Sequence, residues 1–281
     1  MHLSKRALLG GGVALLGTAV AGKTLADTFG PVAVRHYHLA TPKWPASAAP
    51  LKIVFISDTH IGSPSVPLTR VKEIVDLANA QLPDITLLGG DYLISDVIGG
   101  SYVPPEAIAP EIARLRAPYG VYSVLGNHEW YKDGEGMWRE LEQNGVTVLE
   151  NAGREIATSD GGSFWLAGLA DDTTRQPDYT HAMANAPADK PVIALMHDPA
   201  ALTYCDTRPA LALAGHTHGG QITAPLHGAF FNASRAPLEY SYGHVKWDEK
   251  DLIVTSGIGT SVMPFRFFTE PEIVVIHLSH S

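Results

Sequence analysis

Five short apolar segments organise the chain, and each is followed within three residues by an acid, an amide or a histidine. They cover residues 53–56, 85–88, 121–125, 192–196 and 211–214. Continuous apolar runs of this length, bounded by turn residues, predict strands that are buried on both faces, as in sheets covered by helices. Because ligands of such folds gather beyond the carboxyl ends of the strands, the polar residues at these five ends predict one shared site.

Helical spacing between these runs predicts the covering helices. In residues 68–81, Val71, Ile74, Val75 and Ala78 recur at the spacing of one helix face, with charged residues between them. We expect further helices at 104–116, 136–144 and 179–186, and further strands at 147–149, 155–157, 164–169, 238–245, 251–255 and 273–278. A front half that alternates strands with helices and a strand-rich back half predict an α/β (α+β) fold of four layers, in which two mixed β-sheets are flanked by helices.

Residues 1–26 have the layout of an export signal or an uncleaved signal anchor. Ser4-Lys5-Arg6 precedes residues 7–22, which carry no charge, and 19–21 or 24–26 offers small residues for cleavage. The apolar run is short for a spanning helix, and a buried helix of the globular domain is disfavoured because the run has no polar face. We expect residues 27–50 to form a lead-in strand plus linker, and 51–281 to form one domain.

Composition narrows the function classes. The chain has 281 residues, 45% of them hydrophobic, and a formal net charge of −9. This charge gives no basic footprint, so a nucleic-acid partner is not expected, and an anionic substrate would need bound cations to receive it. The single cysteine, Cys205, excludes an intrachain disulfide and a metal cluster of thiolates.

The strand ends together supply a set of metal-ligand side chains. This set comprises Asp58, His60, Asp91, Asn127, His128, His197, His216 and His218. Oxygen and imidazole donors without thiolate suit Mn, Fe or Zn ions. Seven of them besides His128 exceed what one four-coordinate ion needs, so their number predicts two metal ions, divalent or trivalent. Asp91 is the natural bridging ligand, because two glycines before it allow the backbone to approach closely.

Taken in order, these strings resemble the motifs of the calcineurin-like metallophosphoesterases. The resemblance covers roughly residues 51–278 and rests on Asp58-x-His60, Gly90-Asp91, Gly126-Asn127-His128-Glu129, His197 and Gly215-His216-x-His218. It implies a sandwich of two mixed sheets flanked by helices. It further implies a first metal on Asp58, His60, Asp91 and His218, and a second metal on Asp91, Asn127, His197 and His216.

Two weaker likenesses point to the cell envelope. Residues 255–272 resemble a bacterial membrane-associated branch of this family, which includes twin-arginine exported phosphoesterases and UDP-2,3-diacylglucosamine pyrophosphohydrolases. Residues 4–9 resemble a twin-arginine signal, with Lys5 in place of the usual first arginine. The resemblance implies an exported protein in the periplasm or on the outer face of the cytoplasmic membrane, with a membrane surface as a candidate partner.

The implied activity is hydrolysis of a phosphoester or phosphoanhydride by in-line attack of a metal-bound hydroxide. His128 is the candidate acid for the leaving oxygen. Ile94 and Ser95 stand where the protein phosphatases of the family have an acid and an arginine, so a phosphoprotein substrate is not expected, and Asp96 is one candidate partner of His128. We expect a cell-envelope or lipid-linked phosphate as substrate. The alternatives are small soluble phosphodiesters or monoesters, or a non-catalytic metal-binding module.

The segment around Arg266 allows two interpretations. Arg266 is a candidate for binding a substrate phosphate. The apolar residues beside it, at 262–265 and 267–268, would either fill the core of the sandwich or contact acyl chains and the membrane surface.

Overall fold

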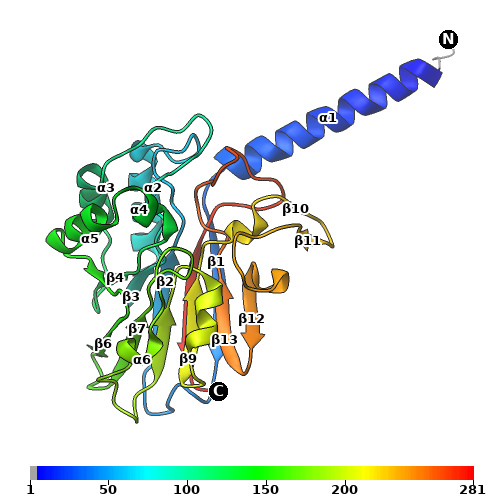
Figure 1. The fold of residues 1–281 in the computed structure, drawn as a ribbon. Coiled ribbons are helices and arrows are strands. Elements are labelled where there is room, and N and C mark those ends of the chain that lie inside the picture. The colour runs from blue at the N-terminus through cyan, green and yellow to red at the C-terminus, as the bar shows by residue number, and fades with distance from the viewer. Residues whose placement is uncertain (1–4) are drawn as a thin grey trace.

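The computed structural model describes residues 5–281, with side-chain surroundings from residue 17 onward. Two six-stranded sheets face each other in it, and a two-stranded ribbon stands apart (Figure 1). The first sheet contains, in spatial order, β1 (Ala33–Ala40), β14 (Glu272–Ser279), β2 (Leu51–Ile56), β3 (Ile85–Leu88), β4 (Val121–Ser123) and β5 (Thr147–Val148). The second contains β12 (Gly243–Trp247), β13 (Lys250–Val254), β9 (Pro209–Ala214), β8 (Val192–Leu195), β7 (Ser163–Gly168) and β6 (Ala152–Ala157). The ribbon is β10 (Thr223–Ala224) with β11 (Gly228–Ala229).

Both sheets are mixed, because each combines parallel central strands with antiparallel pairs. β2, β3, β4 and β5 run parallel, whereas β14 pairs antiparallel with β2. In the second sheet β7, β8, β9 and β13 run parallel, and β6 and β12 are antiparallel to their neighbours. Parallel central strands bring their carboxyl ends to one edge of each sheet, which is where the predicted site residues follow.

Helices cover the outer face of the first sheet. α2 (Leu68–Ala80), α3 (Pro105–Ile112) and α5 (Gly134–Gln143) pack there, and α4 (Asn127–Lys132) leads into α5 (Figure 1). α6 (Tyr179–Ala182) and the 3₁₀ turn η1 (Pro199–Tyr204) lie outside the second sheet. The core between the sheets contains Phe55 and Leu87 of the first sheet and Leu195 and Leu211 of the second. The predicted fold class, two mixed sheets flanked by helices, is confirmed.

Several predicted elements were wrong in extent. The helix expected at 104–116 ends at Ile112, and the strand expected at 155–157 begins at Ala152. The strand expected at 238–245 begins only at Gly243, because Pro237 opens the 3₁₀ turn η3 (Leu238–Tyr240) and Gly243 has a φ of 84°. The helix expected at 179–186 ends at Ala182. Pro187 follows the predicted end, and a proline disfavours helical backbone at the residue before it.

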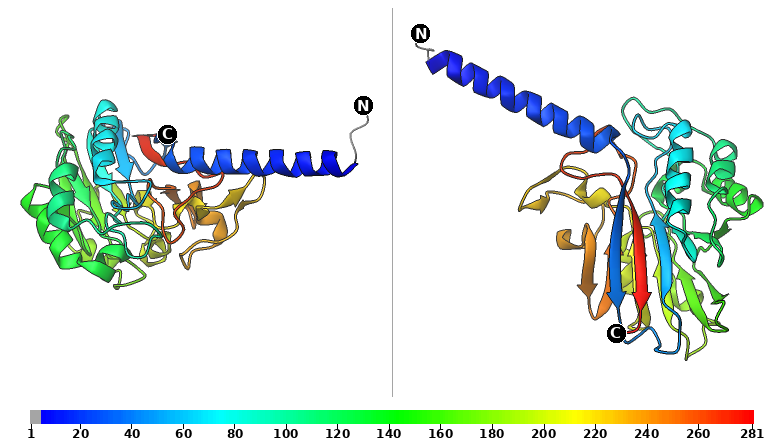
Figure 2. Two further views of the ribbon diagram at one scale, coloured as in Figure 1. Left: turned by 90° about the horizontal axis from the view of Figure 1, so that it is seen from above. Right: turned by 180° about the vertical axis from the view of Figure 1, so that it is seen from behind.

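Helix α1 (Lys5–Phe29) projects from the body as one continuous helix (Figures 1 and 2). It runs through both of the predicted cleavage positions, while residues 1–4 of the predicted signal lie outside the described residues. Its carboxyl end is fixed to the body: the Asp27 carboxylate accepts a hydrogen bond from the Phe268 backbone N–H at 2.7 Å, and Thr28 Oγ1 accepts one from that of Arg266 at 2.8 Å. Strand β1 follows and pairs in parallel with β14, so the region expected to hold a lead-in strand plus linker contains a strand of the first sheet. Among residues 5–281, no helix combines the length and the hydropathy of a membrane-spanning segment.

Candidate metal centre

The structure brings all eight predicted strand-end residues to one place. Asp58 and His60 follow β2, Asp91 follows β3, Asn127 and His128 begin α4 beyond β4, His197 follows β8, and His216 and His218 follow β9. Each of these side chains is buried. Buried carboxylates and imidazoles are rare unless a partner or a metal ion compensates them.

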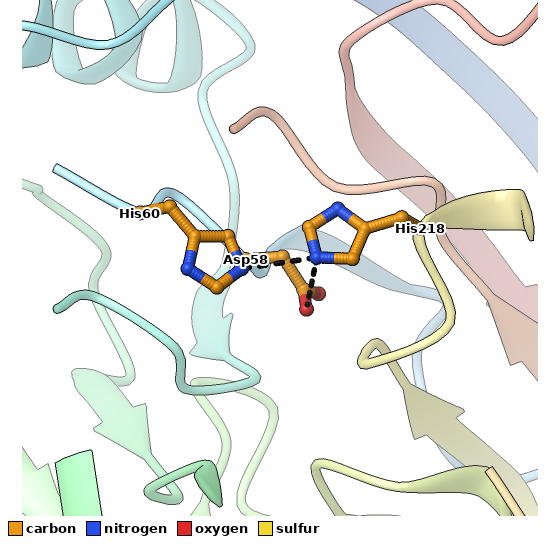
Figure 3. A group of neighbouring side chains, drawn as sticks. All are labelled: Asp58, His60 and His218. Atoms are coloured by element: carbon orange, nitrogen blue, oxygen red, sulfur yellow. Dashed lines mark hydrogen bonds and ion pairs between the residues drawn. The ribbon is translucent and has the colours of Figure 1, made fainter. Parts of the chain in front are cut away.

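A first group consists of Asp58, His60 and His218 (Figure 3). The Nε2 atoms of His60 and His218 lie 2.9 Å apart, and His218 Nε2 lies 3.6 Å from Asp58 Oδ1. His60 Nδ1 lies 3.1 Å from the Leu93 carbonyl oxygen, which accepts its proton. Donation from Nδ1 leaves the lone pair on Nε2 free for a metal ion.

A second group surrounds His197. Its Nε2 atom lies 3.1 Å from Asn127 Oδ1 and 3.1 Å from His216 Nδ1, and its Nδ1 atom lies 2.7 Å from the Gly89 carbonyl oxygen. The His216 Nε2 atom is buried and has no hydrogen-bond partner among the described residues, although Asp198 Oδ2 lies 3.6 Å away. Convergent nitrogens of this kind, without a full set of hydrogen-bond partners, fit a group of metal ligands.

Asp91 lies between the two groups. Its Oδ2 atom is 3.6 Å from His60 Nε2 and 3.3 Å from His197 Nε2, while its Oδ1 atom accepts the His128 backbone N–H at 3.0 Å. A carboxylate that faces two ligand groups can bridge two ions. The assignment of these side chains to two ions, which the family resemblance implies, stays a prediction.

The backbone of the ligand residues is unusual. Five of them have a positive φ, between 42° and 66°: Asp58, His60, Asp91, His216 and His218. Non-glycine residues adopt this region at a cost, and such strain concentrates at functional sites. Gly90, at a φ of 86°, shows how tightly the strand ends meet, because a Cβ atom there would lie 2.4 Å from the Gly126 nitrogen.

Burial and mutual proximity shift the pKa values of the cluster. Burial, with His128 nearby, lowers the pKa of His60 to about 3, so its imidazole is neutral. Burial raises the pKa of Asp58. Burial alone would also raise the pKa of Asp91, but the imidazoles of His197 and His128 hold it well below its usual range. Against the opposing effect of burial, the Asp91 carboxylate raises the pKa of His197 well above its usual value. The neutral imidazole of His60 beside two buried carboxyl groups fits a cation, and this donor set suits Mn, Fe or Zn.

Glu129 is a structural member of the site whose role the sequence analysis missed. Its side chain is fully buried, and its carboxylate accepts backbone N–H groups of Asp91, Tyr92, Leu93 and Gly126 at 2.7–2.9 Å. It therefore fixes the loop that carries Asp91 against the loop that carries Asn127. Its position three residues after Gly126, at a helix start, resembles a capping box and was the available signal.

His128 is oriented by Ser95. The Ser95 backbone N–H donates to His128 Nδ1 at 3.1 Å, and Ser95 Oγ lies at 3.1 Å from the same atom. A neutral imidazole that accepts at Nδ1 carries its proton on Nε2, which faces Asp91 Oδ2 at 4.0 Å. The candidate partner from the sequence, Asp96, is exposed instead. A backbone donor leaves no signal in residue type, so this contact was not predictable.

Arg266 lies behind His218. Its guanidinium is fully buried, donating to the carbonyl oxygens of Ser256 and Gly259, and its Nη2 atom is 3.3 Å from His218 Nδ1. Burial lowers its pKa to about 10. Contact with a substrate phosphate stays a prediction; this placement supports a role in positioning His218.

A pocket of about 450 Å³ opens onto the cluster. His128, His216 and His218 form its floor, and Tyr131, Phe231 and Val262 stand among its walls. No Lys or Arg of the described residues lines it, whereas Asp91 and Asp96 do. The described lining of this pocket therefore offers a phosphate no Lys or Arg side chain.

Comparison with known proteins gives the class of this site. Residues 51–220 match the calcineurin-like phosphoesterase family. The chain is 31% identical over 229 residues to the uncharacterized metallophosphoesterase YkuE of Bacillus subtilis (strain 168), covering 81% of this chain and 78% of the relative. It is 32% identical over 239 residues to the phosphodiesterase YaeI of Escherichia coli (strain K12), covering 83% of each. Among solved structures, a 5'-nucleotidase precursor of Thermus thermophilus aligns at a TM-score of 0.46 and 15% identity, over 74% of this chain and 49% of that one.

The chain belongs to the calcineurin-like phosphoesterase family, as its motifs predicted. It is a metal-dependent hydrolase that acts on phosphoester bonds.

Proposed function

We propose that this hydrolase holds two metal ions and cleaves phosphodiesters of the cell envelope that carry a lipid group. One observation carries the proposal of two ions: a single carboxylate oxygen of Asp91 faces His60 at 3.6 Å and His197 at 3.3 Å. The first ion would be held by Asp58, His60, Asp91 and His218, and the second by Asp91, Asn127, His197 and His216. When bound, the ions would neutralise phosphate charge and lower the pKa of water.

The protein's own groups orient these ligands. The carbonyl oxygens of Leu93 and Gly89 accept the Nδ1 protons of His60 and His197, which points both Nε2 atoms into the site. Glu129 holds the Asp91 loop through backbone hydrogen bonds. Ser95 directs the Nε2 proton of His128 into the pocket, where it can be donated to a leaving oxygen.

The pocket lining favours a diester over a monoester. A phosphate monoester carries a second negative charge near neutral pH. Beyond the proposed ions, the described pocket residues offer this charge the exposed carboxylate of Asp96 and no Lys or Arg side chain. A diester carries one charge and a second substituent, for which Tyr131, Phe231 and Val262 supply apolar wall. The printed name of the relative YaeI, a phosphodiesterase, supports the same choice.

The envelope location rests on the amino-terminal segment and on the segment 262–268. The uncharged run 7–22 after Lys5 and Arg6 supports export, by the twin-arginine or another route, to the periplasm or the outer face of the cytoplasmic membrane. Val262, Met263 and Phe268 are exposed, and of the described residues 262–268 none belongs to a core cluster of the sandwich. This exposure supports contact with acyl chains over the core-filling alternative.

The test is hydrolysis by metal-stripped protein reloaded with Mn²⁺. We expect metal-dependent turnover of bis-nitrophenyl phosphate that exceeds turnover of nitrophenyl phosphate, and higher kcat/KM for a diester with an acyl chain. Asp96→Asn should raise kcat/KM for the monoester selectively. Faster monoester turnover would contradict the diester assignment, equal rates with and without an acyl chain would favour small soluble substrates, and loaded protein without turnover would favour a binding module.

A further inference from the structure

We propose that an exposed apolar surface around the pocket mouth docks on a phospholipid bilayer. This surface, called here the apolar rim, consists of Leu226, Phe230, Phe231, Val262, Met263 and Phe268, all exposed. Phe231 is 71% exposed and Val262 is 62% exposed, which is unusual for side chains of this kind when they cluster. That the substrate is a lipid rests on the proposed function. The apolar rim would be the surface that presents this substrate to the pocket.

The rim is one structural unit, although two separate segments supply it. The Thr223 backbone N–H donates to the Phe267 carbonyl oxygen at 2.9 Å, and Ile222 forms a parallel bridge with Phe267. The Gln221 side-chain amide donates to the carbonyl oxygens of Ser261 and Met263 at 3.1 and 3.0 Å. The ribbon β10–β11 and the segment 261–269 are therefore held together.

The rim lacks the charges found elsewhere on this chain. Residues 221–234 contain no Asp, Glu, Lys or Arg, and residues 255–269 contain only Arg266, which is fully buried. At the chain-wide charged share of 17%, about five charged residues would be expected in segments of this combined length. Protein partners normally meet a polar and partly charged border, whereas a bilayer interior excludes charge.

Helix α1 leaves the body beside the rim. In two further views, α1 and the ribbon β10–β11 project on the same side of the molecule (Figure 2). Val20 and Leu25 of α1 are exposed, and its segment 7–22 carries no charge. An apolar helix that projects next to an apolar surface indicates one shared apolar environment, which a lipid surface provides.

Two polar side chains contact aromatic rings of the rim. The Lys23 Nζ atom lies 5.3 Å from the centre of the Phe268 ring, and the His227 ring stacks on that of Phe230 at 4.5 Å. A lysine over an aromatic ring, and aromatic rings with a polar edge, are typical of residues at a membrane interface.

The rim is continuous with the metal centre. Phe231 and Val262 belong to the rim and also line the pocket whose floor contains His128 and His218. A lipid with its acyl chains against the rim would therefore bring its phosphate to the pocket mouth without leaving the bilayer surface.

Fluorescence labelling tests the contact directly. Because Cys205 is the single cysteine and is buried, Leu226→Cys and the control Leu82→Cys can each be labelled with an environment-sensitive dye in a Cys205→Ala background. Leu82 is 79% exposed and precedes β3, so it lies at the end of that strand opposite the site. With vesicles of phosphatidylcholine containing one third phosphatidylglycerol, we expect a blue shift and a several-fold rise in emission at 226 and no change at 82. Equal responses at both positions, or none at 226, would overturn the proposal.

A substitution experiment measures what the rim contributes. The double variant Leu226→Ser/Phe230→Ser should lower vesicle partitioning of the full chain at least ~10-fold, whereas Leu82→Ser should leave it unchanged. Neither side chain lines the metal pocket, so hydrolysis of soluble bis-nitrophenyl phosphate should stay at the wild-type rate. Unchanged partitioning would overturn the proposal, as would self-association of the wild type through these residues without vesicle binding. Failure of the wild type to hydrolyse the soluble diester would count against the proposed function and not against the docking surface.

Discussion

The Nε2 atom of His60 lies 2.9 Å from the Nε2 atom of His218, although 158 positions separate the two residues in the sequence. Only one proton can occupy the line between two ring nitrogens. Burial lowers the pKa of both imidazoles, that of His60 to about 3 and that of His218 well below its usual value. Two neutral, facing nitrogens next to the Asp58 carboxylate are better explained by a bound cation than by a shared proton.

Removing one of these nitrogens should remove one ion. We expect His218→Ala to lower the metal content of Mn²⁺-loaded, gel-filtered protein by about one ion per chain, since a four-ligand set loses a ligand. His277→Ala is the control, because His277 stacks on His38 at the far end of the first sheet. Equal metal contents in both variants and the wild type, measured by plasma mass spectrometry, would exclude this ligand role.

Metal removal should destabilise the fold. Ions held in the proposed site would compensate the buried carboxyl groups of Asp58 and Asp91, so their removal by a chelator should lower Tm, and added Mn²⁺ should restore it. At free metal about 100-fold above Kd, linkage gives about 2.7 kcal/mol. A thermal scan that does not change with chelator would contradict binding at this site.

His128 should matter most for poor leaving groups. We expect His128→Ala to keep its metal and to lose about 100-fold or more in kcat with an alkyl leaving group, but less with nitrophenolate, which needs no proton. Ser95→Ala should lose less than about tenfold, because the backbone N–H that orients Nδ1 remains. Equal losses of His128→Ala on both leaving groups would remove the proton-donor role.

Replacing Glu129 should lower the free energy of unfolding more than replacing an exposed acid does. Glu129→Ala would leave four buried backbone N–H groups without their acceptor, so we expect about 3 kcal/mol of destabilisation or more in urea unfolding. Glu135→Ala, at an exposed position in the first turn of α5, is the matched control. A loss no larger than that of the control would show that the loops hold without this carboxylate.

Titration of Glu150 should lower the free energy of unfolding as pH rises. Burial raises its pKa from 4.5 to about 8, and its Oε1 atom accepts the Leu125 backbone N–H. The folded state therefore keeps the proton that the unfolded chain releases, so this contribution is full below about pH 4.5 and is lost as pH rises through about 8. Glu150→Gln should flatten the decline in the urea midpoint between mildly acidic and alkaline pH. If the urea midpoint of Glu150→Gln fell as steeply with pH as that of the wild type, another titrating group would be responsible for the decline.

The sequence predicted those parts of the fold that depend on local pattern. The runs of β2, β3, β8 and β9 are apolar at every or nearly every position, as strands buried on both faces are. The side chains after these runs supplied the predicted ligand set, which the fold brings together. What it could not predict depends on backbone and distant contacts: the left-handed φ of Asp58, the Ser95 N–H on His128, and the burial of Arg266 behind His218. The identity of a residue does not predict these features, because each depends on chain segments that meet only in the folded state.

Asp91 is the proposed bridge between two metal ions in a working phosphodiesterase. The most direct measurement compares metal content and bis-nitrophenyl phosphate hydrolysis in the wild type, Asp91→Asn and the control Asp96→Asn, all reloaded with Mn²⁺. We predict about two ions per chain and metal-dependent turnover for the wild type and the control. For Asp91→Asn we predict at most one ion and a rate lower by about 1,000-fold. Two retained ions with a near-wild-type rate in Asp91→Asn would contradict the account.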